Sequence, residues 1–69
     1  MNEALRRVTR AAIKERGTIS EAASAIGMTQ PEFSRKLHSD SFFNIEQFMG
    51  ICSYTGRTAD ELYREAVGA

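Results

Sequence analysis

The sequence predicts an all-α fold of five short helices. Three observations favour it: capping-box patterns at helix starts, glycines where apolar periodicity stops, and no segment that alternates apolar and polar residues as a strand does. The chain of 69 residues suffices for one domain, 1–69. The predicted helices lie at about 2–16, 19–26, 30–38, 45–55 and 59–67.

Four of these helices begin with a capping box, in which a Ser, Thr or Asn stands three residues before a Glu or Gln. Each side chain of the pair binds the other residue's backbone N–H. The four pairs are Thr18 with Glu21, Thr29 with Glu32, Asn44 with Gln47, and Thr58 with Glu61.

Glycines mark the predicted helix ends. Gly17, Gly27 and Gly56 each follow an apolar-periodic run, and glycine suits the left-handed C-terminal position. Pro31 falls in the first turn of its helix, where its missing N–H costs nothing.

Helical spacing also predicts which residues face the core. The third helix is expected to anchor through Phe33 and Leu37, and Phe43 is expected to staple onto Phe48. The positions expected to be buried on the fourth helix are Ile45, Phe48, Met49 and Cys52.

Charge is unevenly distributed, although the net charge is zero. Residues 1–16 hold five basic and two acidic side chains, whereas 41–69 hold two basic and four acidic ones. A neutral domain is not typical of non-specific nucleic-acid binders, so DNA binding would need a local basic face, specific contacts or several copies.

Composition predicts a cytoplasmic location. No apolar run reaches the roughly 18 residues of a membrane helix. The first ten residues, MNEALRRVTR, carry charge where a signal peptide needs an apolar stretch. Cys52 is the single cysteine, which excludes an internal disulfide, and its apolar surroundings predict core packing.

The two helices over 19–38 are joined by a tight turn that contains glycine, which is the helix-turn-helix arrangement. If Phe33 and Leu37 face the core, the opposite face of the third helix is polar and suits a DNA major groove. The side chains predicted to contact bases are Gln30, Pro31, Ser34, Arg35 and His38. Those predicted to contact phosphates are Thr18, Ser20, Thr29, Lys36, Ser41 and Asn44.

The same segment resembles the Cro/repressor-type helix-turn-helix of phage and bacterial regulators. The matching residues are Ala23, Gly27, Phe33 and the pair Ser34-Arg35, and the likeness continues through NIEQFMGICSYTGRTADELY. NEALRR and GTISEAASAIGMTQPEFSRK are also similar to the lambda-type lysogeny activators. The chain departs from the pattern at Lys36, a position usually apolar, so that Leu37 takes over the anchoring.

This resemblance implies a transcriptional regulator that binds double-stranded DNA sequence-specifically, with repression favoured over activation. It implies a homodimer on a pseudo-palindromic operator, with half-sites about 34 Å apart. The expected dimer interface, a surface this short chain is expected to leave uncovered, comprises Phe42, Leu62, Tyr63 and Ala66.

The alternative is a helix-turn-helix module that binds a protein, as an anti-repressor or antitoxin-like partner does. Zero net charge and the acidic last two helices favour that alternative. An enzyme is not expected, because the sequence has no nucleophile–base set, Gly-rich phosphate loop or cluster of metal ligands. No metal, cofactor or small-molecule ligand is expected either.

Overall fold

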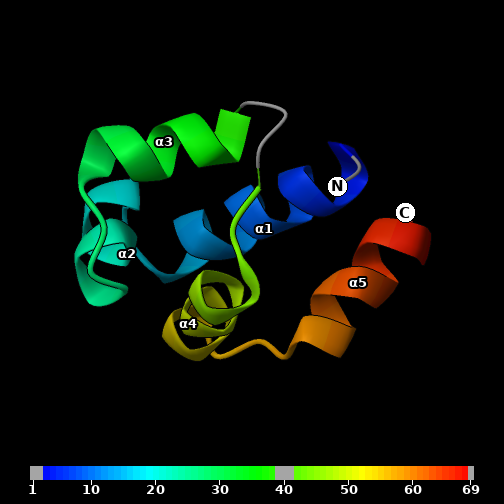
Figure 1. Ribbon diagram of the computed structural model, residues 1–69. Coiled ribbons are helices and arrows are strands. Elements are labelled where there is room, and N and C mark those ends of the chain that lie inside the picture. The colour runs from blue at the N-terminus through cyan, green and yellow to red at the C-terminus, as the bar shows by residue number, and fades with distance from the viewer. Residues whose placement is uncertain (1–2, 39–41, 69) are drawn as a thin grey trace.

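A computed structural model describes residues 3–38 and 42–68, and over these residues the chain forms five helices and no strand (Figure 1). The helices are α1 (Glu3–Arg16), α2 (Ile19–Ala25), α3 (Gln30–His38), α4 (Ile45–Thr55) and α5 (Ala59–Gly68). The all-α prediction is confirmed, and each predicted helix boundary agrees to within one residue. None of the described helices has the length and apolar character needed to cross a membrane.

Side-chain caps fix the four helix starts after α1. The Thr18 N–H donates to Glu21 Oε1 at 2.9 Å, and the Glu21 N–H donates back to Thr18 Oγ1 at 3.0 Å. Asn44 and Gln47 form the same reciprocal pair at α4, as do Thr58 and Glu61 at α5. At α3 half of the box forms, the Glu32 N–H donating to Thr29 Oγ1 at 3.3 Å. Each cap contributes about 1 kcal/mol to helix stability.

Two of the three predicted glycine positions are left-handed. Gly27 and Gly56 have φ values of 75° and 72°, and at the first of these turns the Met28 N–H reaches back to the Ala23 carbonyl at 2.9 Å. The prediction for Gly17 is wrong, because its φ is not positive. A Cβ at residue 17 would instead meet the ends of the Glu21 and Tyr54 side chains, which would have to move aside.

The core consists of two clusters. One joins α1, α2, α3, α4 and the segment before α4, through Ile13, Ala22, Ala23, Phe33, Leu37, Phe43 and Ile51. The other holds α5 against α1, through Leu5, Ala12, Leu62 and Ala66. Phe48 packs against both clusters and connects them. As a result α3 and α5 occupy opposite ends of the fold, with α1 and α4 between them (Figure 1).

The prediction of which α4 residues face the core is partly wrong. Ile45 and Met49 were expected in the core but are exposed, whereas Ile51 is fully buried. The close approach of α2 accounts for this rotation. Gly50 faces Ile26 so closely that a Cβ at residue 50 would lie 2.7 Å from Ile26 Cγ2. With Gly50 turned toward α2, Phe48 and Ile51 point inward and Ile45 and Met49 point to solvent.

The aromatic residues before α4 also pair differently from the expectation. Phe43 packs against Phe33 of α3 with the rings tilted and their centroids 5.0 Å apart, while Phe42 packs on Phe48 at 5.7 Å. The staple onto Phe48 is therefore made by Phe42. Phe43 instead ties the start of α4 to the anchor residue of α3.

Candidate nucleic-acid interface

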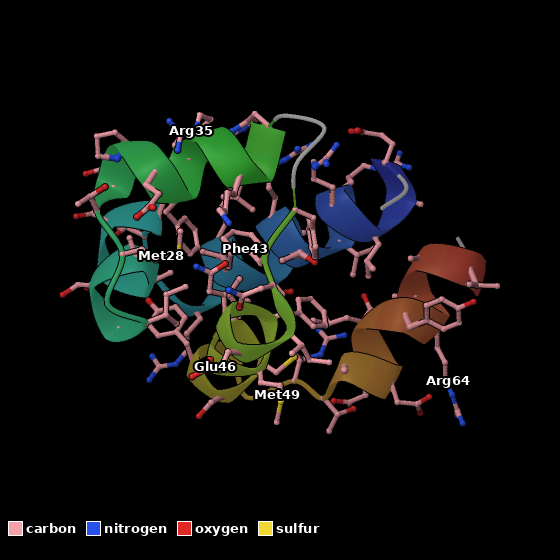
Figure 2. All side chains as sticks on the ribbon, viewed as in Figure 1. Met28, Arg35, Phe43, Glu46, Met49 and Arg64 are labelled. Atoms are coloured by element: carbon pink, nitrogen blue, oxygen red, sulfur yellow. The ribbon has the colours of Figure 1, made fainter. Side chains whose placement is uncertain are left out.

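Helix α3 presents a polar face to solvent because its apolar residues are used as anchors. Phe33 and Leu37 are fully buried on the side that faces α1, α2 and the segment before α4. Four of the five side chains predicted to contact bases are exposed, namely Gln30, Pro31, Arg35 and His38. Ser34, the fifth, is half-buried. Figure 2 shows Arg35 at the outer edge of the molecule, on the side of α3 away from the other helices.

The far end of α3 is held by side chains from two other helices. Arg10 Nη1 on α1 donates to the main-chain carbonyl of Leu37 at 3.4 Å. Lys36 Nζ donates to Gln47 Oε1 on α4, also at 3.4 Å. These contacts join residues 27 and 11 positions apart. In the sequence Arg10 is one of the five basic residues within 1–16, and no local signal singles it out.

Arg35 carries the free positive charge on the exposed face. Within residues 3–38 and 42–68, no carboxylate forms an ion pair with the Arg35 guanidinium, whereas Arg6 and Arg10 both lie near Glu3, at 3.6 and 3.8 Å. A guanidinium without a carboxylate partner keeps its five N–H donors for a planar acceptor pair.

His38 is the last residue of α3, and its side chain is less free to reach outward than that of Arg35. Its Nδ1 lies 2.8 Å from the Ser34 carbonyl oxygen. A carbonyl oxygen only accepts hydrogen bonds, so Nδ1 carries the proton and Nε2 of the neutral ring is an acceptor. The ring therefore caps the last turn of α3 and offers one nitrogen to a ligand.

Three of the predicted phosphate-contacting residues are helix caps. Thr18, Thr29 and Asn44 accept backbone N–H groups at 3.0, 3.3 and 2.8 Å. A hydroxyl that accepts one hydrogen bond still has its own proton to donate, and the Asn44 amide retains its NH₂ group. The caps are therefore compatible with donation to an anion outside the protein.

The remaining predicted phosphate contacts differ in their surroundings. Ser20 is exposed on α2. Lys36 is half-buried and shares Gln47 Oε1 with the Asn44 N–H, which binds that oxygen at 3.0 Å. Its ammonium thus lies near the start of α4. Ser41 falls outside the described residues.

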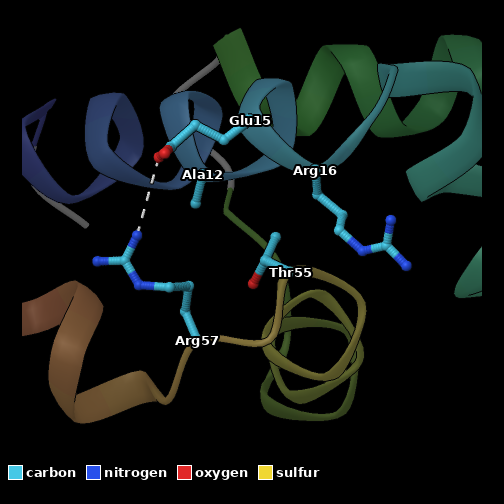
Figure 3. A pocket seen from close by; sticks show the side chains of 5 residues that line it. All are labelled: Ala12, Glu15, Arg16, Thr55 and Arg57. Carbon is cyan, nitrogen blue, oxygen red and sulfur yellow. Dashed lines mark ion pairs between the residues drawn. The ribbon is translucent and has the colours of Figure 1, made fainter.

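A small cavity lies between α1 and the α4–α5 connection (Figure 3). Its volume is about 140 Å³ and its lining residues are Ala12, Glu15, Arg16, Thr55 and Arg57. Arg57 pairs with Glu15 at 3.9 Å and with Glu65, so it joins α1 to α5.

The polar groups that line this cavity make hydrogen bonds and ion pairs within the protein. Thr55 Oγ1 donates within α4, 2.9 Å from the Ile51 carbonyl and 3.2 Å from that of Cys52. The lining contains no His or Cys that could pair with the hydroxyl as a base or nucleophile. In the described part of the chain, no group of three or more His, Cys, Asp or Glu side chains is arranged to hold a metal ion.

The predicted dimer interface needs correction. Leu62 and Ala66 are 0% and 9% exposed, because they pack against Leu5 and Ala12 of α1. Phe42 is half-buried in the aromatic cluster, and only Tyr63 is largely exposed. The apolar residues left on the surface of α4, Ile45 and Met49, had been assigned to the core. The sequence of α4 has more apolar positions than one buried face of a helix can hold. This excess is the sequence signal that some of them lie on the surface.

Comparison of the chain with protein-family models, curated proteins and solved structures gave no significant match.

Proposed function

We propose that this protein is a transcriptional regulator of phage or bacterial type that binds double-stranded DNA sequence-specifically in the cytoplasm. The observation that supports this function best is the division of α3 into two faces. Phe33 and Leu37 are fully buried, and the exposed face carries Arg35 without an ion-pair partner among the described residues. Repression is favoured over activation on the resemblance stated above.

The finer fold assignment belongs to the same proposal: a Cro/repressor-like domain whose helix-turn-helix unit spans about 19–38. Ala23 is buried where α3 crosses α2, which a larger side chain would prevent. Gly27 adopts the left-handed conformation in the turn, and Phe33 is the central anchor of α3. These three features are among those that carried the resemblance in the sequence.

In this proposal α3 enters the major groove, which has the width to admit an α-helix. Arg35 would pair with the O6 and N7 of a guanine, and Gln30 with the N6 and N7 of an adenine. Pro31 offers apolar contact to a thymine methyl group. Ser34 and His38 have smaller roles, because one is half-buried and the ring of the other binds back to the helix.

Phosphate contacts would position α3 in the groove without reading sequence. The hydroxyls of Thr18, Ser20 and Thr29 lie at or next to helix starts, as does the amide of Asn44. Lys36 adds a charge near α4. With so few cations on this face, specific contacts must supply much of the affinity of a chain whose net charge is zero.

The experiment is a selection of duplexes from a random pool, followed by a salt titration on the enriched site. The proposal predicts one enriched motif, bound at least about a thousandfold more tightly than scrambled DNA at physiological salt. The slope of log affinity against log salt concentration reports the number of phosphates contacted.

A second candidate is the protein-interaction module, which the neutral charge and the exposed apolar residues of α4 favour. It predicts no enriched motif, with weak DNA binding that vanishes at physiological salt. An Arg35→Ala change also separates the two functions. It should weaken specific DNA binding about 5- to 150-fold and leave binding of a protein partner at other surfaces intact.

A further inference from the structure

Two arginines of α1 converge on one carboxylate. Arg6 Nη1 lies 3.6 Å from Glu3 Oε2, and Arg10 Nη2 lies 3.8 Å from Glu3 Oε1. Both distances exceed the roughly 2.7 to 2.9 Å of a hydrogen bond between a guanidinium and a carboxylate. Glu3 therefore attracts both cations without a close hydrogen bond to either. We refer to Arg6 and Arg10 as the α1 arginine pair.

The α1 arginine pair is more buried than the carboxylate between its members. The side chains of Arg6 and Arg10 are 9% and 24% exposed, whereas that of Glu3 is 68% exposed. Water screens the charge of an exposed carboxylate, so Glu3 neutralises the two guanidiniums only in part. Glu3 also supplies one negative charge to two positive ones. The pair consequently keeps a net positive charge at a place that is largely shielded from solvent.

Arg6 has more hydrogen-bond donors than the described residues satisfy. Its Nε and Nη2 atoms are buried and have no hydrogen-bond partner. The guanidinium carbon lies 6.0 Å from the centre of the Phe42 ring, which provides cation–π attraction but no oxygen acceptor. Buried donors are usually hydrogen-bonded, because leaving them without a partner costs free energy. The environment of Arg6 is therefore short of negative charge and of acceptor atoms.

Arg10 links this cluster to the end of α3. Its Nη1 donates to the Leu37 carbonyl at 3.4 Å, while its Nη2 is the atom that faces Glu3. A single guanidinium thus contacts the last turn of α3 with one nitrogen and the carboxylate with another. The α1 arginine pair accordingly lies beside the last turn of α3.

We propose that the α1 arginine pair binds a phosphate group, which takes the position of the Glu3 carboxylate between the two guanidiniums. An incoming phosphate can approach both arginines to hydrogen-bond distance, because it is not tethered to the same helix as Glu3 is. Glu3 is mostly exposed, so its side chain can turn into water when the phosphate binds. A phosphodiester of a nucleic acid and a free phosphate group both present this chemistry.

The first test uses inorganic phosphate and the whole chain without DNA, so it does not rest on the proposed function. Phosphate is titrated at constant ionic strength against sodium chloride, and the arginine Nε–H resonances are followed by NMR. We expect the resonances of Arg6 and Arg10 to shift and to saturate, with a midpoint of about 1 to 10 mM. Arg7, an exposed arginine of the same helix, should show no saturable shift.

Two substitutions test the roles of Glu3 and Arg6. Glu3→Gln should tighten phosphate binding about three- to fivefold, because it removes the competing charge. Glu15→Gln is the matched control, since it removes an exposed carboxylate elsewhere on α1 and should leave the affinity unchanged. Arg6→Met should weaken phosphate binding at least about tenfold. Its circular dichroism spectrum should stay helical, because an apolar side chain of similar length replaces a buried charge.

Three results would overturn the proposal. The first is the lack of a saturable shift at Arg6 and Arg10 both in the unchanged protein and in Glu3→Gln. The second is a gain in phosphate affinity from Glu15→Gln that equals the gain from Glu3→Gln. The third is an Arg6→Met variant that is folded and binds phosphate as tightly as the unchanged protein does.

The source of the phosphate group is identified by a second titration, with scrambled duplex DNA. If the α1 arginine pair binds the DNA backbone, Glu3→Gln should tighten DNA binding by a factor similar to that for phosphate. It should also steepen the salt dependence by about one phosphate contact, and Glu15→Gln should do neither. Tighter phosphate binding with unchanged DNA affinity assigns the pair to a free phosphate group. Both results agree with the proposed chemistry, and neither depends on whether α3 reads sequence.

Discussion

Arg10 of α1 donates a hydrogen bond to the main-chain carbonyl of Leu37 in the last turn of α3, over 3.4 Å. The last four carbonyls of a helix have no partner within it, so a cation from another helix both satisfies this group and complements the helix dipole. The contact fixes the end of α3 relative to α1. It thereby links the basic first helix to the surface proposed to read DNA.

Loss of this contact should loosen α3. We expect Arg10→Ala to lower the free energy of unfolding by about 1 kcal/mol, the worth of a typical hydrogen bond, and to lower Tm by about 5 °C. Thermal unfolding followed by circular dichroism measures this. Arg7→Ala removes the same side chain from an exposed position of α1 and should change Tm little. Equal effects of the two changes would show that Arg10 does not hold α3.

Substitutions on α4 distinguish its buried face from its exposed one. Ile51→Ala should cost about 2 to 5 kcal/mol, because Ile51 is fully buried in the cluster with Phe33 and Leu37. Ile45→Ala should stay within about 0.5 kcal/mol, since Ile45 is exposed. Urea unfolding followed by circular dichroism gives both values. The reverse order of costs would mean that Ile45, not Ile51, faces the core.

The close contact of α2 with α4 predicts an unusual response to alanine. Gly50→Ala would raise helix propensity, yet the new Cβ would lie 2.7 Å from Ile26 Cγ2, a branched group that cannot swing aside. We expect a net loss of about 1 to 3 kcal/mol. Gly68→Ala meets nothing within 4 Å and is the matched control, expected to be neutral or slightly stabilising.

A double-mutant cycle identifies the collision as the cause. The cost of Gly50→Ala should shrink in an Ile26→Ala background, where the methyl group is gone. A cost that is the same in both backgrounds would assign the loss to something other than this contact.

Acid should weaken the start of α5. The hydrogen bond from the Thr58 N–H lowers the pKa of Glu61 below its usual value of 4.5. A lowered pKa in the folded state means that this stabilisation is present above pH about 4.5 and is lost as pH falls below it. Glu61→Gln should therefore show a smaller drop in Tm between about pH 6 and pH 3 than the unchanged protein. A steeper drop in the variant would contradict this assignment.

Local chemistry explains which parts of the fold the sequence predicts. The pair Thr18 and Glu21 stands within one helical turn, so its capping role can be recognised from spacing alone. Anchors four apart, Phe33 and Leu37, likewise determine the opposite face of α3, and four of the five predicted base-contacting side chains are exposed there.

Features that depend on contacts between distant segments could not be predicted in this way. Ile45, Met49 and Ile51 are all apolar, and only the approach of α2 at Gly50 decides which of them is buried. The spacing on the last helix likewise could not decide whether Leu62 joins the core or a dimer interface, because the residues that bury it lie on α1, at the other end of the sequence.

The most direct test of the central claim measures the affinity of Arg35→Ala for the enriched duplex by fluorescence anisotropy at physiological salt, with Arg7→Ala as a control for charge. If Arg35 reads a guanine, its loss should weaken binding about 5- to 150-fold and relax discrimination at one base pair of the site. Arg7→Ala should at most reduce the salt slope by about one. Equal, sequence-independent losses from the two changes would contradict the proposal that α3 reads DNA.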